Sequence, residues 1–114
     1  MNKSNLFIIT GTTRGLGQAL KCKLKNNQNN TIVSINRKKI YNSDIVLDLS
    51  KKDINLEKFN NIIDDYEKIF FISNASIIKP IKNIKDITND DLDISIHTNF
   101  INQAKIIMKI VQSN

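Results

Sequence analysis

The chain has 114 residues, of which 40% are hydrophobic and 25% charged, as in one compact soluble domain. Its formal charge of +6 would suit nucleic acid, but the lysines are scattered without interleaved aromatics, which favours a solvated surface and no nucleic-acid partner. A lone Cys22, no apolar run of membrane-spanning length and an N-terminal apolar stretch too short for a signal peptide predict a cytoplasmic protein with no membrane partner and no metal site.

The first half of the chain predicts a strand, a glycine-rich turn, a helix and two further strands. Residues 6–9 are wholly apolar, as in a strand buried on both faces. After the glycines, apolar residues recur at helical spacing, at Leu16, Ala19, Leu20 and Leu24. Cys22 falls off this stripe, so we expect it to be partly exposed. Residues 31–35, rich in β-branched side chains, predict the second strand, and residues 45–47 the third.

The second half predicts a helix, a strand and a long last helix. The first of these helices is traced by Leu56, Phe59, Ile63 and Tyr66. Residues 69–72 are wholly apolar and predict a central strand. Thr88 and Asp91 have the spacing of a capping box at the start of the last helix. The apolar periodicity of that helix runs through Leu92, Ile96, Ile107, Ile110 and Val111. With no internal repeat or linker, this order predicts an α/β, Rossmann-like, doubly wound parallel sheet of about four strands.

The glycine-rich turn predicts a phosphate-binding site. Its residues are Gly11, Thr12, Thr13, Arg14, Gly15, Leu16 and Gly17. The free N–H groups and dipole at a helix start attract an anion, and glycines allow positive φ and a close approach of phosphate. The spacing Gly-x-x-x-Gly-x-Gly differs from the common Gly-x-Gly-x-x-Gly fingerprint. The strand before it and the helix after it favour a phosphate cradle over a merely structural turn.

Residues 9–17 closely resemble the Thr-Gly-x-x-x-Gly-x-Gly signature of the short-chain dehydrogenase/reductase family. Asp48, followed by Leu49, closes the third predicted strand, where the family places an aspartate beside the adenine ring. Asn99 lies in the last helix, where the family carries the asparagine of its catalytic tetrad. These matches occur in the family's order. The resemblance therefore implies a cofactor-binding role for Asp48 and Leu49.

A further match follows the fourth predicted strand. Residues 73–76 resemble the family's Asn-Asn-Ala-Gly segment, which implies that Asn74, Ala75 and Ser76 contact the cofactor. Ser73 and Ser76 depart from that pattern, because they replace its first asparagine and its glycine. The serine at 76 puts in doubt how closely the backbone there approaches the cofactor.

The end of the second strand bears on which dinucleotide is bound. An NAD site usually has a carboxylate there, whereas this chain has the neutral Asn36, followed by Arg37. A guanidinium can bind a 2′-phosphate bidentately, and the resemblance places Arg14 near the same phosphate. We therefore predict that NADP(H) is preferred over NAD(H), with Asn36 and Arg37 among the cofactor-binding residues. The alternative is that both arginines are ordinary surface cations.

Asn99 also stands out from the pattern alone. It shares the apolar stripe of the last helix, so its amide is predicted to face the apolar side. A buried amide must be hydrogen-bonded, which leaves a structural amide or a site residue as its two explanations. The resemblance favours the tetrad asparagine, which the family uses to bend the helix and anchor a water. His97 projects to another side and is expected at the surface or an interface.

The family's remaining catalytic groups are not found. The family donates a proton from the tyrosine of a Tyr-x-x-x-Lys pair, assisted by a serine. Four residues after Tyr41 comes Ile45, and four after Tyr66 comes Phe70. We therefore expect residues 1–114 to be an NAD(P)-binding Rossmann domain that is incomplete at the C-terminus, truncated relative to the family fold and inactive alone. A small carbonyl substrate would be a partner only after completion by the missing half.

The leading interpretation is thus the NADP(H)-binding part of a carbonyl reductase. Its Thr-Gly-Thr-Thr-Arg-Gly-Leu-Gly variant, with Pro80 and Ile81 downstream, resembles the sepiapterin- and benzil-reductase branch, which implies a small ketone, diketone or aldehyde substrate. The alternatives are a non-catalytic dinucleotide- or partner-binding module and an unstable remnant of a broken gene. We also expect self-association through the exposed edge of the fourth strand and the last helix.

Overall fold

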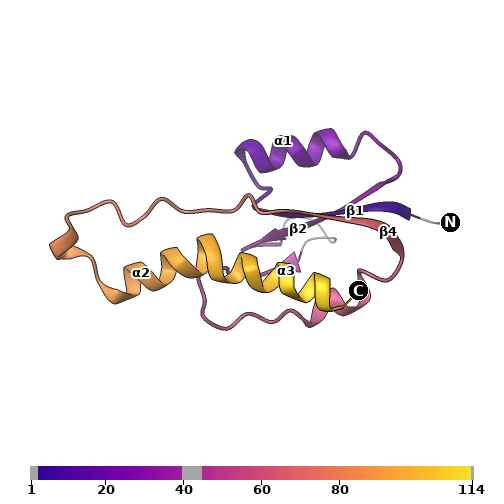
Figure 1. Ribbon diagram of the computed structural model, residues 1–114. Helices are drawn as coiled ribbons and strands as arrows, with labels where there is room; N and C mark the ends of the chain where they lie inside the picture. Colours follow the sequence, from indigo (N-terminus) through magenta and orange to yellow (C-terminus); the bar gives the residue numbers. More distant parts are fainter. Residues whose placement is uncertain (1–2, 40–44, 114) are drawn as a thin grey trace.

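The structure, a computed structural model, describes residues 3–39 and 45–113. They form a four-stranded parallel sheet that has helices on both faces, with the connecting segments between them (Figure 1). The strands β1 (Lys3–Thr10), β2 (Asn30–Asn36), β3 (Ile45–Val46) and β4 (Tyr66–Ile72) lie in the order β3-β2-β1-β4. Figure 1 shows α1 (Gly15–Leu24) on one side of the sheet and the C-terminal helices on the other. The predicted doubly wound α/β sheet of about four strands is confirmed.

Strand β1 is the centre of this arrangement, because it pairs with β2 on one side and with β4 on the other. Leu6, Ile8 and Ile9 are fully buried, as expected for a strand covered on both faces. Leu6 and Ile8 join the main core, which includes Ile106 and Ile110 from α3 (Asn102–Gln112).

The strand order places the glycine turn at a topological switch point. The chain leaves β1 for β2 and β3 on one side and later returns as β4 on the other. In open α/β sheets, ligands bind outside the carboxyl ends of the strands at such a reversal. The glycine turn directly follows β1, so the topology puts it at that place.

The predicted second helix is wrong. Its residues instead form one turn of 3-10 helix, η1 (Glu57–Asn61), and Tyr66 already belongs to β4. Phe59 and Ile63 are nevertheless buried in the core. The spacing identified the core residues correctly, but they lie in a 3-10 turn and a loop rather than in a helix. The consecutive asparagines at 60 and 61 are weak helix formers, which disfavours a longer helix here.

The apolar stripe predicted for α1 is only partly correct. Leu16 and Ala19 are exposed, and the helix turns Gly17 and Lys21 toward the sheet. Close contact at Gly17 sets this orientation, so the leucine that follows Gly15 is left outside. Cys22 is exposed, as predicted.

The last helical segment is α2 (Asn89–Ile96), a π-helical turn η3 (His97–Ile101) and α3. An arm of residues 73–88, with the short 3-10 turn η2 (Ile84–Asp86), connects it to β4 and projects from the body (Figure 1). The predicted capping box is confirmed, because Thr88 Oγ1 accepts from Asp91 N at 3.1 Å and Asp91 Oδ2 accepts from Thr88 N at 2.9 Å.

The predicted apolar face of this segment is largely wrong. Ile110 is buried, but the other four residues of the stripe are between 45% and 66% exposed: Leu92, Ile96, Ile107 and Val111. The π-helical turn adds a residue to one turn and shifts the phase of the periodicity. The buried residues of the segment are Thr98, Asn102, Gln103, Ile106 and Ile110.

Candidate functional site: the glycine turn and its neighbours

The glycine turn has an open outer side. Gly11 and Gly15 have φ values of +75° and +60°, which other residues rarely adopt. A Cβ on Gly17 would collide with the carbonyl oxygen of Gly11, so the glycine lets α1 start against the end of β1. A Cβ on Gly15 would meet no atom within 4 Å. Since the first turn of α1 has no acidic side chain and its N-cap Arg14 makes no side-chain cap bond, the residues present fit a phosphate group.

The segment after β4 is attached to this turn. Asn74 Nδ2 donates to the carbonyl oxygen of Gly11 at 2.8 Å. The backbone N–H groups of Asn74 and Ala75 both donate to Thr10 Oγ1, each at 3.0 Å. Gly11 also packs on Ala75, where an added Cβ would lie 3.1 Å from its Cα. The residues at 10, 11, 74 and 75 that the sequence paired with the family signature therefore lie together.

The side chain of Asn36, at the end of β2, is hydrogen-bonded to Thr12 in the glycine turn. Its Oδ1 accepts from Thr12 N at 2.9 Å, and its Nδ2 donates to Thr12 Oγ1 at 3.0 Å. Both residues are buried. The amide is thus used within the protein, and Arg37, which directly follows β2, is exposed.

The carboxylate of Asp48 is held by its neighbour Ser50. Its Oδ1 accepts from Ser50 Oγ at 2.6 Å and from Ser50 N at 3.0 Å. The Ser50 hydroxyl bond is the main cause that lowers the pKa of Asp48, which partial burial opposes and Lys51 and Arg37 assist. Asp48 is therefore ionised at neutral pH, and the field of Arg37 reaches it.

Asn99 corrects one expectation. It was predicted on the apolar side of the helix, but it is exposed, because the π-helical turn rotates it away. Both polar atoms of its amide are hydrogen-bonded to the backbone of Ile77: Oδ1 accepts from Ile77 N and Nδ2 donates to Ile77 O, both at 2.8 Å. This pair anchors the arm to the helix. His97 is half-buried and its Nδ1 lies 2.7 Å from the carbonyl oxygen of Asp93.

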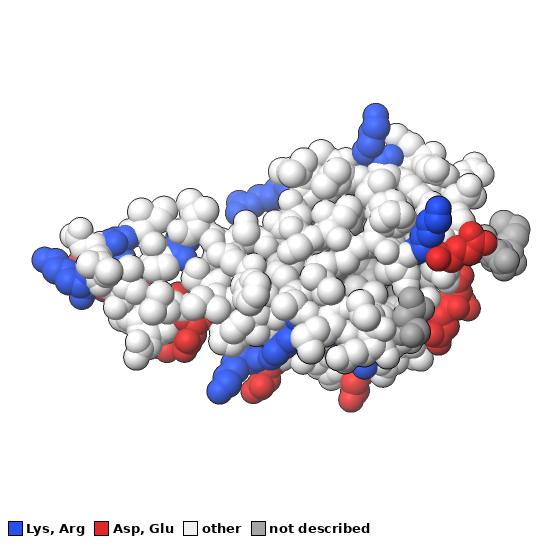
Figure 2. Space-filling view, in the orientation of Figure 1, with Lys and Arg blue, Asp and Glu red and all other residues white. Residues whose placement is uncertain are grey.

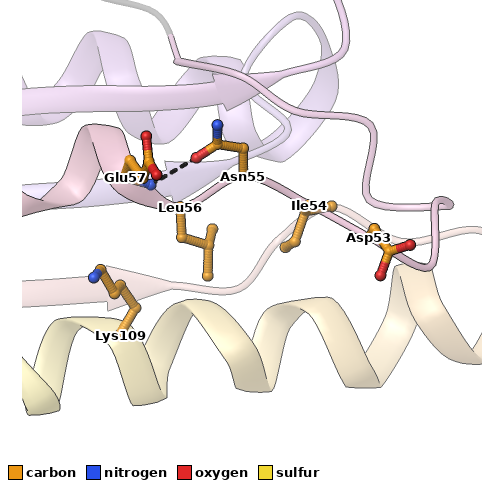
Figure 3. A pocket seen from close by; sticks show the side chains of 6 residues that line it. All are labelled: Asp53, Ile54, Asn55, Leu56, Glu57 and Lys109. Atoms are coloured by element: carbon orange, nitrogen blue, oxygen red, sulfur yellow. Dashed lines mark hydrogen bonds between the residues drawn. The ribbon is translucent and has the colours of Figure 1, made fainter.

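Other surface features do not converge on the turn. A shallow hollow is lined by residues 53–57 and Lys109 and shares no residue with the turn (Figure 3). On the face drawn in Figure 2, lysines and arginines lie in separate groups among acidic residues. Within residues 3–39 and 45–113, no helix is long and apolar enough to cross a membrane, and no three potential metal ligands gather.

A curated relative matches most of this chain in sequence. No family model matches the chain. The benzil reductase ((S)-benzoin forming) of Bacillus cereus is 32% identical over 111 residues, which cover 82% of this chain and 44% of the relative. The chain belongs to the short-chain dehydrogenase/reductase family. The chain spans less than half the length of that curated relative.

Two solved structures share the fold. A short-chain dehydrogenase/reductase from Burkholderia vietnamiensis has a TM-score of 0.80 at 18% identity, over 99% of this chain and 58% of that one. A short chain dehydrogenase family protein from Francisella tularensis subsp. tularensis SCHU S4 has a TM-score of 0.73 at 23% identity, over 97% and 46%. Membership of the short-chain dehydrogenase/reductases implies a nicotinamide dinucleotide cofactor.

The remaining residues that the resemblance selected differ in exposure. Thr13, Arg14, Leu16 and Ser76 are exposed, whereas Thr12 and Leu49 are buried. Two buried residues of α3 were not selected from the sequence: Gln103, which bonds to Thr10 and Ala75, and Asn102, which bonds to Leu49 and Lys51. Their signal was present in the spacing, because Gln103, Ile106 and Ile110 recur at three and four residues.

Proposed function

We propose that this short-chain dehydrogenase/reductase chain binds NADP(H) in preference to NAD(H). The observation that carries the proposal is the open space at Gly15, together with two exposed arginines, Arg14 directly before α1 and Arg37 directly after β2. At the end of β2 the neutral Asn36 bonds to Thr12, so no carboxylate there repels a 2′-phosphate. Residues 11–17 would hold the phosphates, and Asp48, Leu49 and residues 74–76 would complete the site.

The activity to which this site contributes is the reduction of a small carbonyl compound in the cytoplasm. The cofactor supplies a hydride when bound. Because the chain is similar to a benzil reductase, an α-diketone is the first substrate to test. Within the 114 residues, neither tyrosine is followed four positions later by lysine, so we propose that the proton donor lies outside them and that the chain alone is inactive.

Binding of NADPH and NADH to the purified chain, measured by calorimetry beside a thermal melt, tests the cofactor proposal. We expect saturable NADPH binding that raises the melting temperature, and weaker binding of NADH. Arg37→Ala should weaken NADPH binding about tenfold or more and leave NADH binding nearly unchanged, because a charge-assisted phosphate contact is lost. Lys23→Ala, at the opposite end of α1, is the matched control. Equal affinity of the native chain for both cofactors would overturn the preference.

A non-catalytic partner-binding module is the second candidate. The observation that favours it is the row of exposed apolar residues on the last helical segment, together with Phe70 at 42% exposure on β4. A cooperatively melting assembly that binds neither cofactor would support this candidate, and a sample that lacks a cooperative melt would support the unstable remnant.

A further inference from the structure

Two consecutive buried amides begin α3. Asn102 is fully buried and Gln103 is 4% exposed. A buried amide lowers stability unless its hydrogen bonds are made inside the protein. Gln103 makes such bonds through both Oε1 and Nε2. Asn102 makes them through Nδ2, whereas its Oδ1 has no hydrogen-bond partner among the described residues.

Gln103 connects three segments. Its Nε2 donates to the carbonyl oxygen of Ala75 at 2.9 Å and to that of Thr98 at 3.2 Å. Its Oε1 accepts from Thr10 Oγ1 at 3.1 Å. Thr10 Oγ1 in turn accepts the two N–H groups of Asn74 and Ala75. The end of β1, the segment after β4 and the π-helical turn are therefore joined through one side chain.

Asn102 acts on a different segment. Its Nδ2 donates to the carbonyl oxygens of Leu49 and Lys51, both at 2.7 Å. These carbonyls flank Ser50, whose N–H and hydroxyl hold the Asp48 carboxylate. The buried side chain of Asn102 thus holds the backbone of residues 49–51 against α3.

We propose that Asn102 and Gln103 are positioning residues that divide the cofactor site between them. Asn102 positions residues 48–51 for the adenosine part, and Gln103 positions residues 73–76 for the remainder of the dinucleotide. This assignment rests on the proposed dinucleotide binding. One turn of one helix then sets the relative position of two loops that are more than 20 residues apart in the sequence.

Hydrogen exchange on the purified chain without cofactor tests the positioning directly. Asn102→Leu should raise amide exchange in residues 48–52 and leave residues 73–77 unchanged, and Gln103→Leu should do the reverse. Gln112→Leu, on the exposed side of the same helix, is the matched control and should change neither. If a leucine variant fails to melt cooperatively, Asn102→Ser and Gln103→Met replace it. Exchange that rises equally in both segments, or in neither, overturns the proposal.

Binding of two probes tests the consequence for the cofactor. Adenosine 2′,5′-bisphosphate carries only the adenine half of NADPH. Asn102→Leu should weaken binding of both probes by a similar factor, about five- to tenfold. Gln103→Leu should weaken NADPH by about the same factor and leave the bisphosphate within about twofold. An equal loss of both probes in both variants overturns the division of roles. Failure of the native chain to bind either probe, with the exchange pattern as expected, overturns the proposed function and the cofactor role that rests on it.

Discussion

Strands β1 and β4 are neighbours with similar apolar runs, yet they differ in environment. In β1, Leu6, Ile8 and Ile9 are fully buried. In β4, Phe70 is 42% exposed, although its ring stacks on Phe7 with centroids 4.6 Å apart. Among the described residues β1 has a strand on each side, and β4 has one only on the side of β1. The comparison teaches that an apolar run predicts a strand, and that burial depends on what lies beside it.

The largest expected effect is a difference in the free energy of unfolding between substitutions in β1 and in β4. Ile8→Ala removes a fully buried side chain from the main core and should lower the free energy of unfolding by about 4 kcal/mol. Phe70→Ala, on the exposed strand, should lower it by only about 1 kcal/mol. Urea denaturation followed by circular dichroism measures both. Similar losses would show that the exposed strand is covered in solution.

A second substitution sharpens the contrast at the end of β1. Gly17→Ala should lower the free energy of unfolding by about 3 kcal/mol, because its Cβ meets the backbone oxygen of Gly11, which cannot move cheaply. Gly15→Ala should lower it by about 1 kcal/mol, since space is open there and only the positive φ is unfavourable. The same denaturation experiment compares them. If the order were reversed, the close contact of α1 with β1 would be wrong.

Association between copies tests the exposed strand in another way. We propose that the outer edge of β4 and the exposed side of the last helix bind a second copy of the chain. Phe70→Lys and Val111→Lys should each weaken self-association about tenfold, because a lysine must be desolvated at the contact. Ile78→Lys, on the projecting arm, is the control. Sedimentation velocity over a concentration series gives the result, and a native chain that stays monomeric throughout contradicts it.

The smallest expected effect concerns an ion pair between the arm and the start of α2, which should alter how the melting temperature depends on pH. Asp91 bonds to Thr88 and pairs with Lys82 Nζ at 2.6 Å, and the Lys82 contact is the main cause that lowers its pKa to about 2 from 3.8. A depressed carboxyl pKa stabilises the fold above the unfolded value, and this contribution is lost as pH falls from about 4 to 2. Asp91→Asn should therefore reduce the acid dependence of the melting temperature in that window. An unchanged slope would show that the pair contributes nothing in solution.

Some parts of the fold and of the site could be predicted because their determinants are local. Positive φ at Gly11 and Gly15 requires glycine wherever the turn is placed, and the Thr88–Asp91 box depends on four consecutive residues. The wrong expectations for Asn99 and the second helix share another cause. Apolar spacing marks residues that reach the core, but a π-helical turn or an irregular segment changes which side chains do so.

The sequence by itself determined the strands, the glycine turn and the family resemblance, since these depend on short patterns of side-chain type. Only the tertiary structure decided that Asn102 and Gln103 face the core, that Asn36 bonds to Thr12 and that Leu16 is exposed. Each of these outcomes depends on contacts between residues far apart in the chain. Hydrogen bonds across 24 to 93 residues have no signature in local periodicity, because the partner is chosen by how the helices pack on the sheet.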